Sequence, residues 1–306
     1  MAMKEIPAPA FELGPIRPPS EAYSLLIRVT KNCPWNRCKF CGTYKEGKFQ
    51  LRPVGEIKQD IETARSIQDM IKEISWKSGY GGRLKEIASM VLNNPPNEAH
   101  YNVALWLYAG GESAFLQDAN SLIMKTSEPV EVIRFLKKLD ELIELKGAGL
   151  SRLHIGMESG YDPILQYIDK GVTAAEHIAG GRNVVKSGIS LCEYVVLGLG
   201  GKAMWQEQAT ETARALNAID PDFIRVRALT INKRMSLYDE AEAGSFIGAT
   251  DEEIIEEEKL LIEHLECNSN YVSDHITNLL QEIEGKLPQD KEMTLATIYR
   301  FQGLSP

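Results

Sequence analysis

The chain has 306 residues, of which 43% are hydrophobic and 25% are charged, and its formal net charge at pH 7 is −9. The acidic balance argues against a nucleic-acid partner, because phosphate binding requires clustered Lys and Arg side chains. No apolar run approaches the roughly 20 residues of a membrane-spanning helix, and no basic stretch followed by an apolar segment opens the chain. We therefore expect a globular protein with no membrane partner and a cytoplasmic location.

The first part of the sequence predicts an arm, a strand and two helices. Residues 1–22 are rich in Pro and have no periodicity, which indicates an extended N-terminal arm. The apolar run over 24–30 predicts a buried strand. Apolar residues spaced by three and four positions predict helices over 54–75 and 84–92.

The next part of the sequence is less regular. The apolar run over 103–108 predicts a strand that ends at Gly110-Gly-Glu112. Between this point and residue 153 the pattern gives one helix, over 130–145, and only an ill-placed strand candidate over 121–124. We therefore predict that a strand is missing or distorted in this stretch.

Strand and helix patterns then alternate. Strands are predicted over 153–157, 189–197 and 223–231, and helices over 163–169, 173–186 and 205–217. This alternation is typical of βαβ units in a parallel sheet, so the fold class is α/β. In such folds the chemistry gathers at the carboxyl ends of the strands.

The character of the sequence changes near its end. The acidic segment over 251–266 predicts a helix with a solvated face, and further helical pieces are predicted over 271–286 and 293–301. We expect residues 236–306 to form a C-terminal helical extension.

Three of the five cysteines lie within nine residues, in the segment Cys33-Pro-Trp-Asn-Arg-Cys38-Lys-Phe-Cys41. An odd number distributed in this way does not suggest a disulfide framework, and a tight cysteine group indicates a metal site. Three thiolates can hold three irons of a cubane and leave the fourth iron open. Two alternatives are a zinc site completed by a distant His and a cysteine group with no metal, although the polar residues between the cysteines argue against the second.

This segment resembles the signature of the radical S-adenosylmethionine (radical SAM) superfamily. The family pattern has three residues between the first two cysteines and two before the third, with an aromatic residue just before the last. This chain has four residues in the first gap, and Phe40 keeps the aromatic position. The resemblance implies a [4Fe–4S] cluster on Cys33, Cys38 and Cys41, and SAM bound to the open iron through its amino and carboxylate groups. It also implies a partial (β/α)6 TIM-like barrel over residues 23–235.

The resemblance further implies a set of SAM contacts. Gly110, Gly111 and Glu112 look like the segment that holds the SAM amino group, although such a triplet can also be a plain turn. The segment over 153–160 is similar to one in methylthiotransferases and related iron–sulfur oxidoreductases. The resemblance would bring Glu158, or else Ser159, to the ribose of SAM. The alternative for Glu158 is that it is an acidic residue at a helix N-terminus, where the helix dipole stabilises its charge. The glycine-rich segment over 198–201 looks like the strand end near the adenine, or a strand-to-helix turn.

Two further groups of residues are candidates for binding. Arg225 and Arg227 alternate on the last predicted barrel strand, so both point to one face, where they could bind the SAM carboxylate, an acidic substrate or a salt-bridge partner. Asp274, His275 and Asn278 fall on the predicted C-terminal helix and are candidate substrate contacts or helix caps.

The resemblance implies an enzyme that cleaves SAM reductively to a 5′-deoxyadenosyl radical, which abstracts hydrogen from an unknown small-molecule substrate. An external low-potential donor such as flavodoxin or ferredoxin would reduce the cluster. The isolated Cys192 and Cys267 argue against a second cluster. The alternatives are a porphyrinogen-oxidising or RNA-modifying enzyme of the same superfamily, and a non-catalytic iron–sulfur or zinc-binding protein, which would ignore SAM.

Overall fold

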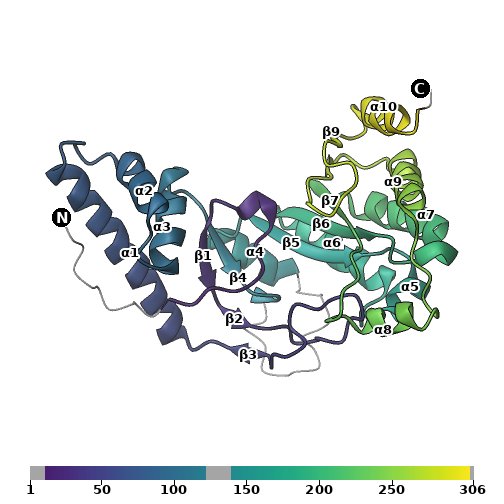
Figure 1. Ribbon diagram of the computed structural model, residues 1–306, viewed down its shortest axis with the longest axis horizontal. Coiled ribbons are helices and arrows are strands. Elements are labelled where there is room, and N and C mark those ends of the chain that lie inside the picture. Colours follow the sequence, from purple (N-terminus) through teal and green to yellow (C-terminus); the bar gives the residue numbers. More distant parts are fainter. Residues whose placement is uncertain (1–10, 122–138, 304–306) are drawn as a thin grey trace. The chain divides into compact units, whose positions relative to one another are not determined.

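The computed structural model describes residues 11–121 and 139–303 (Figure 1). The chain forms two compact units, each made from two separate segments. The first unit comprises residues 1–34 and 46–127, and the second comprises residues 35–45 and 128–306. The short segment 35–45, which carries Cys38 and Cys41, therefore belongs to the second unit.

The first unit contains a parallel pair of strands, β1 (Leu25–Arg28) and β4 (Ala114–Gln117), with Leu25 opposite Ala114. The same unit also contains a short antiparallel pair, β2 (Thr30–Lys31) and β3 (Gln50–Leu51), and a 3-10 turn, η1 (Pro19–Glu21). Parallel strands need a long connection, and here it contains three helices. The predicted strand over 24–30 is confirmed.

The three helices are α1 (Val54–Lys77), α2 (Leu84–Asn93) and α3 (Glu98–Tyr108). Their buried apolar residues, which include Ile71 and Val103, form one core with β1. The helices predicted over 54–75 and 84–92 are confirmed, but the strand predicted over 103–108 is wrong. Those residues continue α3, which the Asn97 side chain caps by accepting from His100 N. A six-residue apolar run fits a buried strand and a buried helix equally well.

The second unit contains a five-stranded sheet in the order β5-β6-β7-β8-β9. Figure 1 labels β5, β6 and β7 at its centre. The strands are β5 (Arg152–Glu158), β6 (Ser190–Leu197), β7 (Phe223–Ala228), β8 (Asn270–Val272) and β9 (Glu284–Lys286). The parallel arrangement predicted for β5, β6 and β7 is confirmed, β8 adds a fourth parallel strand that was not predicted, and β9 runs antiparallel to β8.

Seven helices of the second unit are described: α4 (Leu139–Gly147), α5 (Asp162–Tyr167), α6 (Ala174–Lys186), α7 (Gly201–Ile219), α8 (Ser236–Glu242), α9 (Asp251–His264) and α10 (Lys291–Phe301). Capping boxes at Thr173 and Thr250 begin α6 and α9. No described helix is both long and apolar enough to cross a bilayer. The first part of the helix predicted over 130–145, and most of the strand candidate over 121–124, lie outside the described residues.

The helix predicted over 271–286 is wrong. Tyr271 is 1% exposed on β8, and its hydroxyl donates to Glu258 Oε1 at 3.0 Å. The backbone of residues 270–272 pairs with β7, so the C-terminal part of the chain adds two strands to the sheet as well as helices. The strand that carries Arg225 and Arg227 is therefore not the last one.

The two faces of the sheet differ in chemistry. Met157, Val195, Leu197, Ile224 and Val226 pack with residues of α7 and α9 in one apolar core. Because side chains alternate along a strand, the opposite face carries the residues between these positions. We call it the inner face, and its side chains include His154, Tyr194, Arg225 and Arg227.

Three glutamates are buried within the second unit. Burial raises the pKa of Glu193 and of Glu257 to about 8 each, and the pKa of Glu258 to about 7. Glu257 Oε2 accepts from Gly198 N at 3.0 Å, which joins α9 to the end of β6. The fold therefore favours the neutral form of these carboxyl groups.

Replacing Glu257 by Gln should flatten the pH dependence of stability. The folded-state pKa of Glu257 lies above its ordinary value of 4.5, so its contribution is complete below about pH 4.5 and is lost as the pH rises through 8. The Gln side chain keeps an acceptor for Gly198 N and cannot ionise. We expect the free energy of unfolding of Glu257→Gln to exceed that of wild type by roughly 4 kcal/mol at pH 8.5 and by less than about 1 kcal/mol at pH 5. Urea unfolding at both pH values, with both proteins in the same cluster state, checks this, and an equal difference at both would contradict it.

Candidate functional site

The loop over residues 35–45 is anchored to the rest of the second unit by its backbone. Lys39 N donates to Ile168 O at 2.9 Å, and Leu237 N donates to Lys39 O at 3.1 Å. Trp35 Nε1 donates to Asp169 O at 2.6 Å. The residues between Cys38 and Cys41 therefore lie between the end of α5 and the start of α8.

The same loop is also held from inside. Asn36 Nδ2 donates to Tyr44 O at 2.6 Å, and Lys45 Nζ donates to Asn36 O at 3.2 Å and to Cys38 O at 2.9 Å. Cys41 N donates to Cys38 O at 3.3 Å. These bonds join three points of the loop backbone through the Lys45 and Asn36 side chains, so the segment from Asn36 to Lys45 is held together.

The cysteines fall into two classes. Cys33, Cys38 and Cys41 are partly exposed thiols, whereas Cys192 and Cys267 are buried thiols. In type and number these three partly exposed thiols fit an iron–sulfur cluster, whose irons are held by thiolates. Cys33 belongs to the first unit and the other two to the second. Over residues 11–121 and 139–303, no three His, Cys, Asp or Glu side chains already gather at one point as metal ligands.

Phe40 anchors the loop through apolar contact. Its ring packs against the cluster of Ile164, Ile168, Val196 and Leu199, which joins α5 to the end of β6. Lys170 Nζ lies 6.0 Å from the centroid of the Phe40 ring. The aromatic position of the cysteine segment thus contacts the carboxyl end of the second unit's sheet.

Glu158 lies at a β-bulge that ends β5. The register with β6 shifts between Gly156 and Glu158, and Glu158 has φ +69°. Its Oε1 accepts from Lys170 Nζ at 3.0 Å, and both side chains are mostly buried. A Cβ at Gly156 would overlap Glu158 Oε1, so this carboxylate lies directly over a glycine. Lys170 is a site residue that the sequence prediction missed, although the Lys170-Gly171 pair stands in the segment that carries the resemblance.

Ser159 has a structural role at the same strand end. Its side chain is fully buried, and its hydroxyl accepts from Tyr161 N at 3.1 Å. Gly160 N donates to Thr212 Oγ1 at 2.8 Å. These bonds hold the turn from β5 to α5 against α7.

Gly110, Gly111 and Glu112 do not end a strand, so the position predicted for them is wrong. Gly111 N donates to Trp106 O and Gly110 N to Leu107 O, and both glycines have positive φ, as at a helix C-terminus. The triplet precedes β4 and therefore lies at the amino end of the β1–β4 pair, whereas the cysteine segment follows the carboxyl end of β1. The contact of this triplet with SAM stays a prediction.

The carboxyl end of β4 instead leads to Asp118, which the sequence analysis missed. Its Oδ2 lies 2.8 Å from Arg28 Nη2 at the end of β1. Burial raises the pKa of the Asp118 carboxyl, and the Arg28 guanidinium opposes this effect. An acidic residue directly after a strand is a sequence signal for a site residue. Here the strand was predicted over 103–108 instead of Ala114–Gln117, so this signal was not visible.

The segment over 198–201 is a strand-to-helix turn. Gly198 has φ +83°, and Gly201 N donates to Gly198 O at 3.0 Å. A Cβ at Gly200 would lie 2.8 Å from the backbone of Met204. The turn interpretation is confirmed, and a contact with adenine stays a prediction.

Arg225 and Arg227 share the inner face of β7 but have different surroundings. Arg225 Nη1 lies 2.6 Å from Asp274 Oδ1 and 2.7 Å from Oδ2, so the salt-bridge alternative is confirmed for this residue. Burial is the largest single influence on the pKa of Arg225 and lowers it, but the hydrogen bond with Asp274 and the charges of nearby acidic groups together raise this pKa. Arg227 Nε is buried and has no hydrogen-bond partner in the described part of the chain.

Asp274, His275 and Asn278 lie in the loop between β8 and β9, so the helix predicted for them is wrong. The Asn278 side chain is buried, accepts from Ala228 N at 2.8 Å and donates to Val226 O at 2.9 Å. It therefore has a structural role in fixing this loop to β7. Burial, followed by the charge of Arg227, lowers the pKa of His275. Asp274 and His275 remain beside the two arginines.

Two aromatic groups complete the inner face. The rings of His154 on β5 and Tyr194 on β6 have centroids 6.1 Å apart. Neither was predicted, although their positions alternate with buried apolar residues along both strands.

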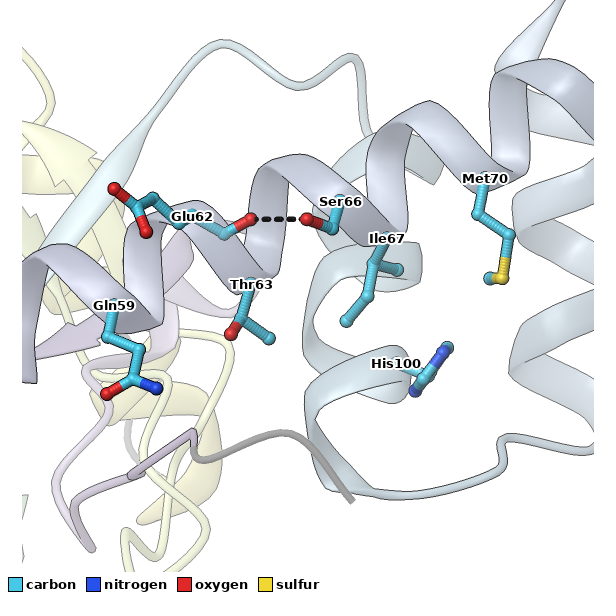
Figure 2. Close-up of a pocket in the computed structure, with 7 residues that line it drawn as sticks. All are labelled: Gln59, Glu62, Thr63, Ser66, Ile67, Met70 and His100. Atoms are coloured by element: carbon cyan, nitrogen blue, oxygen red, sulfur yellow. Dashed lines mark hydrogen bonds between the residues drawn. The ribbon is translucent and has the colours of Figure 1, made fainter. Parts of the chain in front are cut away.

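A separate pocket of about 360 Å³ lies in the first unit, between α1 and α3 (Figure 2). It is lined by Gln59, Glu62, Thr63, Ser66, Ile67, Met70 and His100. His100 Nδ1 lies 2.9 Å from Asn97 Oδ1, and burial lowers the pKa of its imidazole. The lining residues come from helices alone and include none of the predicted site residues.

Comparison with known proteins identifies the superfamily. Residues 27–213, more than half of the chain, match the family model described as the Radical SAM superfamily. A curated relative, an uncharacterized protein of Methanocaldococcus jannaschii, is 27% identical over 137 residues, which are 44% of this chain and 41% of that protein. This chain thus covers less than half of that relative's length.

Solved structures show partial likeness. The radical S-adenosylmethionine methyltransferase TsrM from Kitasatospora setae is 14% identical with a TM-score of 0.44, over 72% of this chain and 37% of that one. Methylornithine synthase (PylB) is 16% identical with a TM-score of 0.43, over 92% of this chain and 82% of that one.

A substitution at Gly171 should disturb the cysteine loop specifically. Gly171 has φ +77°, and a Cβ there would lie 2.6 Å from Trp35 Cε2. Gly188 has the same φ but open space around it, so it is a matched control. We expect Gly171→Ala and Gly188→Ala each to lose about 1 kcal/mol from backbone strain. Only Gly171→Ala should also lower the iron bound per chain after anaerobic reconstitution; equal iron in both variants would contradict this account of the loop.

Removing the Asn278 side chain should destabilise the fold. In Asn278→Ala the buried Ala228 N and Val226 O lose their partner, which we expect to lower the free energy of unfolding by about 2 kcal/mol. Asn268 is exposed, so Asn268→Ala should stay within about 0.5 kcal/mol of wild type. Urea unfolding of both variants provides the measurement, and a wild-type stability for Asn278→Ala would show that the loop is held by other contacts.

Proposed function

This chain belongs to the radical SAM superfamily, and we propose that it cleaves S-adenosylmethionine reductively with a [4Fe–4S] cluster on Cys33, Cys38 and Cys41. Members of this family bind a [4Fe–4S] cluster and SAM. When bound, these two groups supply the radical chemistry that removes a hydrogen atom from a substrate carbon. The observation that carries the proposal is the family match, which begins within β1 and includes all three cysteines, β5 and β6.

The loop provides the ligands in a conformation that is partly set in advance. Its backbone is bonded to Ile168 and Leu237, and the Lys45 ammonium group donates to the carbonyl oxygens of Asn36 and Cys38. A loop with fixed backbone loses less conformational entropy when its side chains bind a metal. This supports Cys38 and Cys41 as ligands, with Cys33 as the third because it lies on the same nine-residue segment.

We assign the ribose contact to Glu158 rather than to Ser159. The Ser159 hydroxyl is fully buried and already accepts from Tyr161 N. Glu158 lies at the carboxyl end of β5 on the inner face, and Lys170 fixes one of its oxygens. The other oxygen can accept from a ribose hydroxyl, since an ionised carboxylate has several lone pairs.

The proposed reaction needs one electron for each SAM that is cleaved. Cys192 and Cys267 are buried and isolated in the sequence, so they do not supply a second cluster. We therefore propose that an external low-potential protein, of the flavodoxin or ferredoxin kind, delivers the electron to the cluster.

The first test measures SAM cleavage. The protein is reconstituted anaerobically with iron and sulfide, reduced with dithionite and given SAM, and 5′-deoxyadenosine is quantified. We expect product from wild type and from Cys267→Ala, in which a buried cysteine outside the loop is removed. Cys38→Ala should give none, because one iron loses its ligand.

Two outcomes would contradict the proposal. An intact cluster that neither cleaves SAM nor changes its spectrum when SAM is added would leave a non-catalytic iron–sulfur protein. Tightly held zinc with no cluster formation would indicate the zinc-binding alternative.

A further inference from the structure

Two arginines on the inner face of β7 differ in whether an acidic side chain neutralises their charge. The charge of Arg225 is matched by Asp274, whose two oxygens both contact Nη1. Arg227 is half-buried, and within the described residues it has neither an ion pair nor a hydrogen bond. The two residues are only two positions apart on one strand and point to the same face.

The acids around this face do not compensate Arg227. Glu158 is paired with Lys170, and Asp274 is paired with Arg225. His275 adds no second charge near neutral pH, because burial and the Arg227 charge lower its pKa below the ordinary value of 6.5. Among these groups the two ion pairs cancel, and the charge of Arg227 is left without a partner.

A buried guanidinium N–H without an acceptor is unusual in a folded protein. Buried polar groups are almost always hydrogen-bonded, and an exception calls for an explanation such as an absent ligand. The guanidinium has five donors and no acceptor, so only an acceptor group can satisfy it. The missing partner is therefore an anion or a strongly accepting oxygen.

We propose that Arg227 binds a carboxylate of the substrate, so that the substrate is a small molecule that carries a carboxylate. One unmatched positive charge suits a monoanion, whereas a phosphate dianion would leave one excess negative charge on a face where Glu158 and Asp274 already have their own cationic partners. The planar fork of Arg also fits a carboxylate in bidentate geometry. The assignment to substrate rests on the proposed function, in which the open iron holds SAM's own carboxylate.

The experiment compares the chemical accessibility of the two arginines in one protein. Phenylglyoxal, which modifies arginine side chains, is added to the anaerobically reconstituted wild-type protein, and labelling at each residue is followed by peptide mass spectrometry. Arg225 is the internal reference, because it lies on the same strand but has a bound carboxylate. We expect Arg227 to be labelled several times faster than Arg225. Equal or slower labelling of Arg227 overturns the proposal.

Small probes then identify the anion. At constant ionic strength, acetate should slow the labelling of Arg227 in proportion to its concentration, whereas acetamide and chloride should not. Inorganic phosphate should protect less than acetate. Protection by phosphate above that by acetate, or equal protection by acetate and chloride, would overturn the assignment to a carboxylate.

A final comparison separates substrate from SAM. We expect SAM to leave Arg227 open to acetate, and Arg227→Met and Arg227→Lys to bind SAM with wild-type affinity in equilibrium dialysis. If SAM alone blocks labelling and Arg227→Met weakens SAM binding, Arg227 belongs to the SAM site and the proposal is wrong. Labelling requires no SAM cleavage. The test of the anion site therefore gives its own result even if the protein lacks the proposed activity.

Discussion

The docking of the Lys39 backbone determines where two of the cluster cysteines lie. The Lys39 N–H donates to Ile168 O at the end of α5, and the Lys39 carbonyl accepts from Leu237 N at the start of α8. Residues 38–41 are therefore fixed from two sides. Because these are main-chain bonds, they hold the loop whatever side chains face solvent. Phe40 and the Trp35–Gly171 contact add apolar packing to the same anchor. The remaining inner-face groups are placed relative to this loop by α5 and β7.

Strand alternation separates packing from chemistry in the second unit. Ile224 and Val226 face α7 and α9, whereas Arg225 and Arg227 face the other way. The loop after β8 then differentiates the two arginines, since Asn278 fixes it to β7 and Asp274 reaches Arg225 but not Arg227. A single loop thus leaves one cation compensated and its neighbour available.

The sequence predicted most of the second unit, because long periodic segments and β-branched runs leave little ambiguity there. It misassigned residues 103–108, because an apolar run of that length fits either a buried strand or a buried helix, and this error moved Gly110-Gly-Glu112 to the wrong end of a strand. It also missed β8, whose three residues are defined by pairing with β7 rather than by any local pattern. Asp118 was missed because the strand before it was assigned to the wrong residues, and Lys170 was missed because no local pattern shows that it pairs with Glu158.

The long sequence separation between the cysteine loop and its anchors has a consequence for biosynthesis. Trp35 bonds to a carbonyl 134 residues later, and Lys39 bonds to Leu237. A ribosome adds roughly 5–20 residues per second, so the thiols leave the exit tunnel many seconds before α8 exists to hold them. Until then the loop lacks its docked conformation and its cysteines are open to oxidation. Cluster delivery should therefore follow translation of the second unit, and the nascent chain should depend on a reducing environment until that point.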